Sequence, residues 1–383
     1  MQYKTIGEIN HYASENVNPA RFPEQYFELY SVPHFSEGYP EIIKGKDVGA
    51  TKQVVQEGDV LICKINPRIN RVWKVTRHTD YPLIASSEWV IVRNADLNAD
   101  YLTYYFSSPK FRVLINSELT GMGGSLTRAQ PKQIRRYSVP VPDKEEQHFV
   151  VRNLALLDHL ISLRQRQAEK LDELVKARFV EMFGDPVRNT KHWEKSSLLA
   201  LGSCKNGMSF HANESGIKLR CLGVGDFKNL SYIDDVEQLP FVSLAEKPSA
   251  NCFLHDGDIV FVRSNGNKAL VGRCLLVYPR DTPTIYSGFC IRYRLVTEKV
   301  DPIYALHVLK ADGIRQKMSG RGANIQNLNQ KILAAIEMPI PPLPLQNAFA
   351  TFVYEVDREK ERIQRSAALL ETLKRSLMQQ YFG

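Results

Sequence analysis

Two long stretches of the chain carry apolar residues at the spacing of an amphipathic helix. From Gln147 to Phe183, and again from Gln346 to Phe382, there is no proline or glycine. Alternating steps of four and three residues meet an apolar residue at eight of ten positions in each stretch. The pattern predicts two long helices with a coiled-coil seam. The seam residues are Leu154, Leu157, Ile161, Leu171, Val353, Val356, Ile363 and Leu370.

Start and stop signals flank the first of these helices. Asp143 is a suitable N-cap, and Glu146 three residues later completes a capping-box pattern. Gly184 ends the helix, and Pro186 follows shortly after. Each helix of 37 residues would span roughly 55 Å at about 1.5 Å per residue. We expect the second helix to run back antiparallel along the first, with one globular unit at each end. The alternative is a pair of helices that each cover their own globular domain.

The rest of the chain has the pattern of mixed α/β structure. Short β-branched runs predict strands at residues 60–65, 88–92, 259–262 and 291–296. Longer periodic segments predict helices over residues 101–117 and 302–318. We therefore expect an α/β protein with two mixed α/β domains, residues 1–142 and 185–341. A pair of long antiparallel coiled-coil helices, residues 143–184 and 342–383, would separate them.

The two halves of the chain are related by an internal repeat. GDVLICKI beginning at Gly58 and GDIVFVRS beginning at Gly257 are 199 residues apart. The same offset relates VPVP to MPIP and Gln147 to Gln346. Residues 123–184 and 322–383 share 13 identities in 62 aligned positions. The chain is therefore expected to be a pseudo-two-fold tandem repeat, in which each copy has a divergent globular part and a more similar helical tail.

The distribution of charge separates the helices from the globular parts. The net charge is +8. Residues 143–183 carry a net charge of −1 and residues 344–383 a net charge of +1, so the positive excess lies outside the two helices. Neutral helices suit protein–protein packing, and basic globular parts suit contact with phosphate.

Two loops recur in each half with residues suited to DNA. The loop after the first predicted strand of each half is rich in donors: Lys64, Asn66, Arg68, Asn70 and Arg71 in the first half, and Arg263, Asn265, Asn267 and Lys268 in the second. Arginine and lysine can read guanine edges, and asparagine can read adenine. A glycine-rich loop before each long helix adds Arg128, Lys132, Arg321, Asn324 and Lys331 as candidate DNA contacts. The alternative for each loop is a polar turn that touches only water.

These features together resemble the specificity subunits of type I restriction–modification systems. The resemblance rests on GDVLI and GDIVF, the glycine-rich loops, the helix entries VPVPDKEEQ and IPPLPLQ, and FVEMFGDPVRNTKHWE at the junction. It implies that each globular unit is a target-recognition domain that reads one half of a split, asymmetric sequence in double-stranded DNA. It also implies that the long helices set the unread gap and dock two DNA adenine methyltransferase subunits. Motor–nuclease subunits would join through these partners.

Catalysis by this chain is not expected. The Pro341-Pro342 pair lacks the polar and aromatic neighbours of an adenine methyltransferase motif, and there is no P-loop. No cofactor motif and no cluster of metal ligands stands out. The six cysteines form no CxxC pair, which predicts buried reduced thiols. With no secretory signal or membrane span, we expect a cytoplasmic protein without a membrane partner. A second hypothesis is a coiled-coil adaptor without DNA specificity.

Overall fold

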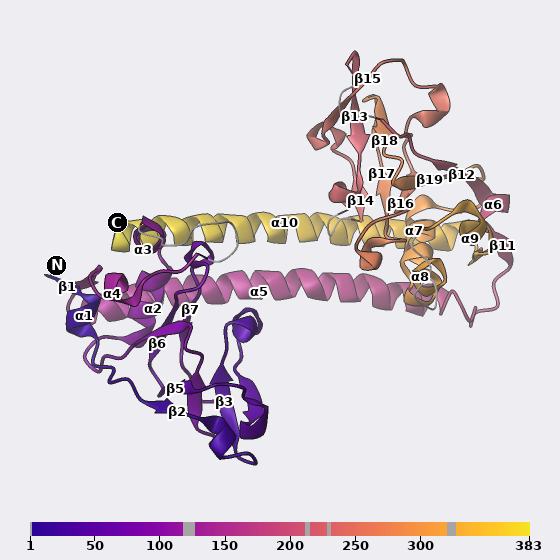
Figure 1. The fold of residues 1–383 in the computed structure, drawn as a ribbon. Helices are drawn as coiled ribbons and strands as arrows, with labels where there is room; N and C mark the ends of the chain where they lie inside the picture. The colour runs from indigo at the N-terminus through magenta and orange to yellow at the C-terminus, as the bar shows by residue number, and fades with distance from the viewer. Residues whose placement is uncertain (1, 118–126, 211–214, 228–230, 320–326) are drawn as a thin grey trace. The chain divides into compact units, whose positions relative to one another are not determined.

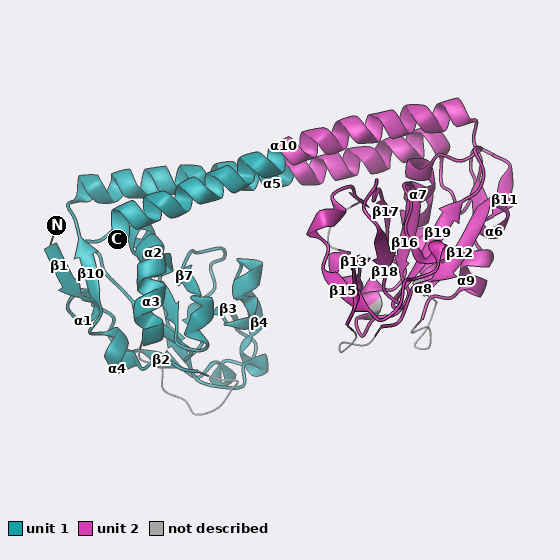
Figure 2. Ribbon diagram, turned by 90° about the horizontal axis from the view of Figure 1, so that it is seen from above, with its two compact units in different colours: residues 1–166, 363–383 teal, residues 167–362 magenta. Residues whose placement is uncertain are grey.

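The computed structural model divides the chain into two compact units. It describes residues 2–117, 127–210, 215–227, 231–319 and 327–383. Unit 1 comprises residues 1–166 together with 363–383, and unit 2 comprises residues 167–362 (Figure 2). Unit 1 is therefore discontinuous in sequence, because its second segment follows unit 2 along the chain.

Unit 1 combines three sheets with short helices. Strands β1 (Gln2–Thr5) and β10 (Ser138–Val141) pair antiparallel. A three-stranded sheet has the order β7 (Val72–Lys74), β6 (Val60–Cys63), β9 (Trp89–Val92). A five-stranded sheet has the order β2 (Asn16–Val17), β5 (Lys52–Val54), β8 (Leu83–Ala85), β3 (Tyr26–Tyr30), β4 (Glu41–Lys44). The helices are α1 (Ile6–Ile9), α2 (Ala99–Ser107), α3 (Pro109–Ser117), α4 (Pro131–Ile134) and the 3₁₀ helices η1 (Pro19–Arg21), η2 (Pro33–Glu37), η3 (Gly45–Asp47) and η4 (Pro67–Ile69).

Unit 2 is built from sheets of the same sizes. Strands β11 (Lys195–Ser197) and β20 (Glu337–Pro339) pair antiparallel. The five-stranded sheet has the order β12 (Gly202–Asn206), β19 (Cys290–Leu295), β16 (Asp258–Val262), β17 (Cys274–Val277), β14 (Tyr232–Ile233), and the three-stranded sheet β15 (Phe241–Leu244), β13 (Ile217–Leu222), β18 (Thr284–Tyr286). The helices are α6 (Leu198–Leu201), α7 (Pro302–Lys310), α8 (Asp312–Ser319), α9 (Gln330–Ala334) and the 3₁₀ helices η5 (Val224–Asp226), η6 (Val236–Gln238), η7 (Ala250–Cys252) and η8 (Lys268–Leu270).

Two 40-residue helices complete both units. These are α5 (Lys144–Phe183) and α10 (Leu343–Phe382), drawn in magenta and yellow in Figure 1. The predicted cap at Asp143 is present, because its carboxylate accepts a hydrogen bond from the Glu146 backbone N–H at 2.8 Å. Within the described residues no helix is both long and apolar enough to cross a bilayer.

The predicted seam residues lie on the inner faces of these helices. Six are buried: Leu154, Leu157, Ile161, Val353, Val356 and Ile363. Leu171 and Leu370 are half-buried. In unit 1 the beginning of α5 meets the end of α10, where Asn153 Nδ2 donates to Tyr381 Oη at 3.1 Å and Lys374 pairs with Asp158. In unit 2 the end of α5 meets the beginning of α10, where Lys360 Nζ lies 2.6 Å from Asp172 Oδ1.

A buried glutamine joins each long helix to a shorter one. Gln147 Oε1 accepts from the backbone N–H of Asn98, and Asn98 caps α2. In unit 2, Gln346 Oε1 accepts from the backbone N–H of Asp301, and Asp301 caps α7. The matched glutamines of the sequence thus fix the starts of α2 and α7, whose apolar faces cover the central strands of their units (Figure 1).

The two intermediate helices are each broken in two, and the prediction of a continuous helix over residues 101–117 and 302–318 was wrong. Ser108 is extended, with φ −69° and ψ 153°, and separates α2 from α3. The following Pro109 disfavours helical geometry at the preceding residue. Ala311 is similarly extended between α7 and α8, and the next helix brings Gly313 against the side chain of Val187. The predicted strands are confirmed as β6, β9, β16 and β19.

Unit 2 is expected to lose stability in acid because of one buried histidine. His307 packs between the rings of Phe179 and Phe349, and its Nε2 atom has no hydrogen-bond partner. Burial, with a smaller contribution from the Lys310 charge, lowers the pKa of His307 to about 3. Between that value and the unfolded pKa of about 6.5, only the unfolded chain binds the proton. The free energy of unfolding therefore falls by about 1.4 kcal/mol per pH unit as the pH drops through this range.

Urea titrations at several pH values, monitored by hydrogen exchange in unit 2, measure how the free energy of unfolding depends on pH. His307→Phe should reduce this slope, whereas His159→Phe, a change at an exposed position of α5, should leave it as it is. An unchanged slope in His307→Phe would contradict the assignment.

Candidate nucleic-acid interface

In both units the backbone joins the two loops that the sequence singles out. In unit 1, Asn66 N–H donates to Thr127 O at 2.9 Å and Ala129 N–H donates to Lys64 O at 2.9 Å. In unit 2, Leu328 N–H donates to Arg263 O at 2.8 Å, and Ser264 forms a bridge with Asn327. The donor-rich loop and the end of the glycine-rich loop thus form one surface feature in each unit.

The unit 1 loop is held in an unusual backbone conformation. Asn66 and Asn70 have φ values of +47° and +49°, on either side of η4. Asparagine tolerates this left-handed region better than most residues. The Asn70 amide donates to Phe106 O at 3.0 Å, so part of this side chain serves the fold. Arg68 lies at the exposed tip of the loop between the two asparagines.

Buried polar atoms without partners gather around this loop. They are Asn70 Oδ1, Arg71 Nη1, Glu88 Oε2, Asn116 Oδ1 and Thr127 Oγ1. Glu88 and Thr127 each accept a backbone hydrogen bond from the loop through their carbonyl oxygens, and the Asn116 amide donates to Pro67 O at 3.4 Å. Buried polar groups in proteins are nearly always hydrogen-bonded. These atoms are enclosed by the fold, so exposed side chains of the loop such as Arg68, and not this cluster, are available to a partner at the surface.

Three candidate cations of unit 1 lie on the two joined loops or next to them in the chain. Arg128 is exposed, and its Nη2 atom lies 3.1 Å from Glu88 Oε1. Lys132 is exposed on α4, and Lys64 is half-buried in the loop. The sequence drew attention to these cations, but it gave no signal for Asn116 and Thr127, because both reach the loop only through the folded chain.

The corresponding loop of unit 2 is arranged differently. Arg263 Nη1 donates to Gly288 O at 3.2 Å, which holds the guanidinium against the turn before β19. The Asn265 side chain accepts from Asn267 N–H, and the Asn267 side chain accepts from Ala269 N–H. Asn267 is exposed and Asn265 is half-buried. Lys268 begins η8, and its side chain lies outside the described part of the structure, as do Arg321 and Asn324.

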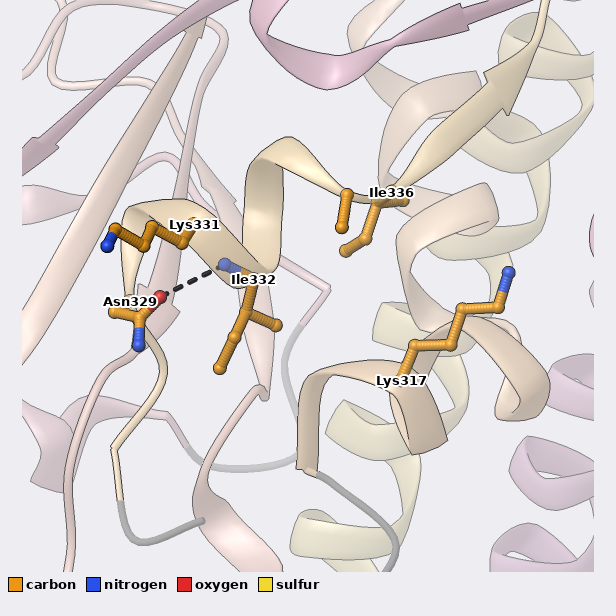
Figure 3. Close-up of a pocket in the computed structure, with 6 residues that line it drawn as sticks. Lys317, Asn329, Lys331, Ile332 and Ile336 are labelled. Carbon is orange, nitrogen blue, oxygen red and sulfur yellow. Dashed lines mark hydrogen bonds between the residues drawn. The ribbon is translucent and has the colours of Figure 1, made fainter.

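Lys331 lies exposed on α9, at the edge of a shallow pocket of about 410 Å³ (Figure 3). The ammonium ends of Lys331 and Lys317 lie on opposite sides of this view, and Ile332 and Ile336 lie between them. Asn329 caps α9 by accepting from Ile332 N–H at 3.0 Å. Because the two ammonium groups do not converge, the pocket offers few polar groups to a small molecule.

The described residues contain no group of three or more His, Cys, Asp or Glu side chains placed to hold a metal ion. Five of the six cysteines are buried and Cys204 is half-buried; all six are unpaired. Burial raises the pKa of Cys221 and Cys290 to about 12. These thiols are therefore protonated at neutral pH and are poor nucleophiles or metal ligands.

Known proteins that are similar to this chain come from one family. Residues 191–371 match the family described as Type I restriction modification DNA specificity domain. The MjaVIII specificity subunit of Methanocaldococcus jannaschii is 23% identical over 373 residues, covering 90% of this chain and 84% of that protein. The StySPI specificity subunit of Salmonella potsdam is 22% identical over 310 residues, covering 75% of this chain and 65% of that protein.

The fold agrees with these matches. A chain from a solved structure concerning complex assembly and conformational transition of the type I R-M system superposes with a TM-score of 0.64 at 17% identity. The superposition covers 100% of this chain and 97% of that one. The chain is therefore similar to type I restriction–modification specificity subunits, in sequence over residues 191–371 for the family and over most of its length for the two subunits.

Proposed function

We propose that this chain recognises a bipartite, asymmetric sequence in double-stranded DNA, with one half-site bound by each unit. The observation that carries the proposal is the joined pair of loops in each unit, which presents the exposed side chains of Arg68 in unit 1 and Asn267 in unit 2. Base edges in the major groove carry acceptors and donors with which arginine and asparagine side chains can pair. The different side chains of the two loops favour two different half-sites.

The long helices are proposed to act as a spacer between two copies of one recognition module. The division into residues 1–142, 143–184, 185–341 and 342–383 follows from this view. Support comes from the repeat at an offset of 199 residues, from the buried seam residues, and from the contacts of α5 with α10 in both units. We propose a coiled coil that fixes the gap between half-sites and docks two DNA adenine methyltransferase subunits, through which motor–nuclease subunits join.

The chain itself is proposed to be non-catalytic. Its role would be to direct the methyltransferase and the nuclease to the target, in the cytoplasm, where reduced cysteines are stable. The competing function is that of an adaptor joining proteins without contacting DNA. Salt dependence separates the two functions, because phosphate contacts release counterions and binding then weakens steeply as salt is raised.

Loss of one side chain that contacts a base should weaken binding to one half-site only. For the complex with the methyltransferase, Arg68→Ala should weaken binding to duplexes that carry the half-site of unit 1. Arg263→Ala should do the same for the half-site of unit 2. A lost base contact of this kind costs about 1–3 kcal/mol, or roughly fivefold to 150-fold in Kd.

The measurement compares the full target with duplexes in which one half-site is scrambled. Arg280→Ala removes the same charge from a surface pair with Asp256 in unit 2 and should bind like the unaltered chain. If Arg68→Ala or Arg263→Ala weakened binding to unrelated DNA by the same factor, these residues would contact only phosphates and would not contribute to specificity.

A further inference from the structure

Phe289 of unit 2 combines an exposed ring with a firmly held backbone. Its side chain is 63% exposed just before β19 begins. Its carbonyl oxygen accepts from Arg263 N–H at 2.8 Å and from Ser264 N–H at 3.3 Å. Its own N–H donates to Ser287 Oγ at 3.3 Å. The ring is therefore presented from the backbone that carries the donor-rich loop.

Close packing behind the ring fixes this presentation. Gly288 N–H donates to Met208 O at 2.6 Å, and Gly207 N–H donates to Cys290 O at 3.0 Å. A Cβ atom at Gly207 would lie 2.1 Å from the carbonyl oxygen of Ser287, so only glycine fits there. The turn that bears Phe289 cannot retreat from the surface without displacing β12 or β19.

In unit 1 the position that corresponds to Phe289 carries a charged side chain. Glu88 immediately precedes β9, and its carbonyl oxygen accepts from Lys64 N–H at 3.0 Å. The Glu88 carboxylate faces Arg128. The position next to the donor-rich loop is thus a carboxylate paired with arginine in unit 1 and a bare phenyl ring in unit 2.

We infer that Phe289 contacts the 5-methyl group of a thymine in the half-site bound by unit 2. The inference rests on the proposed function. Among the base edges in the major groove, the thymine methyl is the apolar group that a phenyl ring can contact. The Arg263 guanidinium, held 3.2 Å from Gly288 O, places a polar reader beside the ring. Phe289 is therefore a specificity-determining residue that selects thymine at one position.

The test is a cycle of two changes, Phe289→Ala in the chain and thymine to deoxyuridine in the DNA. Deoxyuridine keeps the base pair and lacks only the methyl group. For the methyltransferase complex, one deoxyuridine in the half-site should weaken binding about fourfold, as expected for one buried methyl group. Phe289→Ala should weaken binding to thymine DNA by at least as much, and deoxyuridine should then cause no further loss.

A matched variant and the results that would overturn the inference complete the design. Val296, 70% exposed just beyond the other end of β19, should tolerate Val296→Ala without effect. The inference is overturned if the Phe289→Ala complex binds thymine DNA as tightly as the unaltered complex does. It is also overturned if deoxyuridine weakens binding by the Phe289→Ala complex as much as binding by the unaltered complex. A half-site that contains no thymine would overturn it as well. A complex that shows no preference for target over scrambled DNA would instead overturn the proposed function.

Discussion

Replacement of Phe382 by alanine is expected to destabilise unit 1 by about 3–5 kcal/mol. Phe382 is 3% exposed, although it lies far along the chain from residues 1–166, which form the larger part of unit 1. Its ring meets those of Tyr101 and Tyr105 edge-on, at centroid distances of 5.6 and 5.7 Å. Alanine would leave a cavity between α2 and α10, and aromatic pairing would be lost as well.

Hydrogen exchange resolved by peptide is the appropriate measurement, because a chain with two units need not unfold in one step. Peptides of α2 and β6 should lose protection in Phe382→Ala, while those of β16 in unit 2 keep it. Leu369→Ala, at a position of α10 that is 71% exposed, provides the control. Similar protection in both variants would show that the end of α10 does not complete unit 1.

Asp258→Ala should destabilise unit 2 by about 3 kcal/mol or more. The Asp258 carboxylate is fully buried and accepts two hydrogen bonds from Arg294, from Nε and Nη2, each at 2.7 Å. It also accepts from His255 N–H at 2.7 Å. Removing it strands a partly buried guanidinium and a backbone donor at the start of β16, the strand that leads to Arg263.

A neighbouring aspartate provides the control for this experiment. Asp256 pairs with Arg280 at the surface, with side chains 41% and 65% exposed. Such a pair contributes less than about 1 kcal/mol, so Asp256→Ala should remain close to the unaltered protein in urea unfolding. Equal effects of the two substitutions would contradict the structural role of Asp258.

The long helices and main strands could be predicted because their signals are local. Proline, glycine and capping residues mark the ends of α5, and the seam follows from spacing alone. The breaks at Ser108 and Ala311 were missed, because helical periodicity continues across both. Ser108 did carry a signal in the proline that follows it, whereas Ala311 depends on contacts formed only in the folded unit.

The repeated GDV and GDI segments were visible in the sequence, but the structural role of their glycine and aspartate was not. Gly58 and Gly257 have φ values of +88° and +82°, which favour glycine. Asp59 and Asp258 each bind an arginine, Arg93 or Arg294, more than 30 residues further along. Only pairing of the neighbouring strands β6 with β9 and β16 with β19 brings these partners together.

The candidate interface likewise depends on contacts between segments that are distant in the sequence. Composition located the donor-rich and glycine-rich loops, but their joining depends on tertiary structure. The Asn70 amide is partly used inside the fold, which sequence reasoning did not anticipate. Phe289 escaped notice because a search for DNA contacts by charge and polarity passes over an apolar residue.

Mapping of methylated adenines tests the central claim most directly. The chain would be expressed with a DNA adenine methyltransferase subunit that forms a stable complex with it, and the host DNA would be sequenced for methylated bases. A single split motif, methylated only when this chain is present, is the predicted result. A stable complex that adds no methylated motif would contradict DNA recognition by this chain and favour an adaptor.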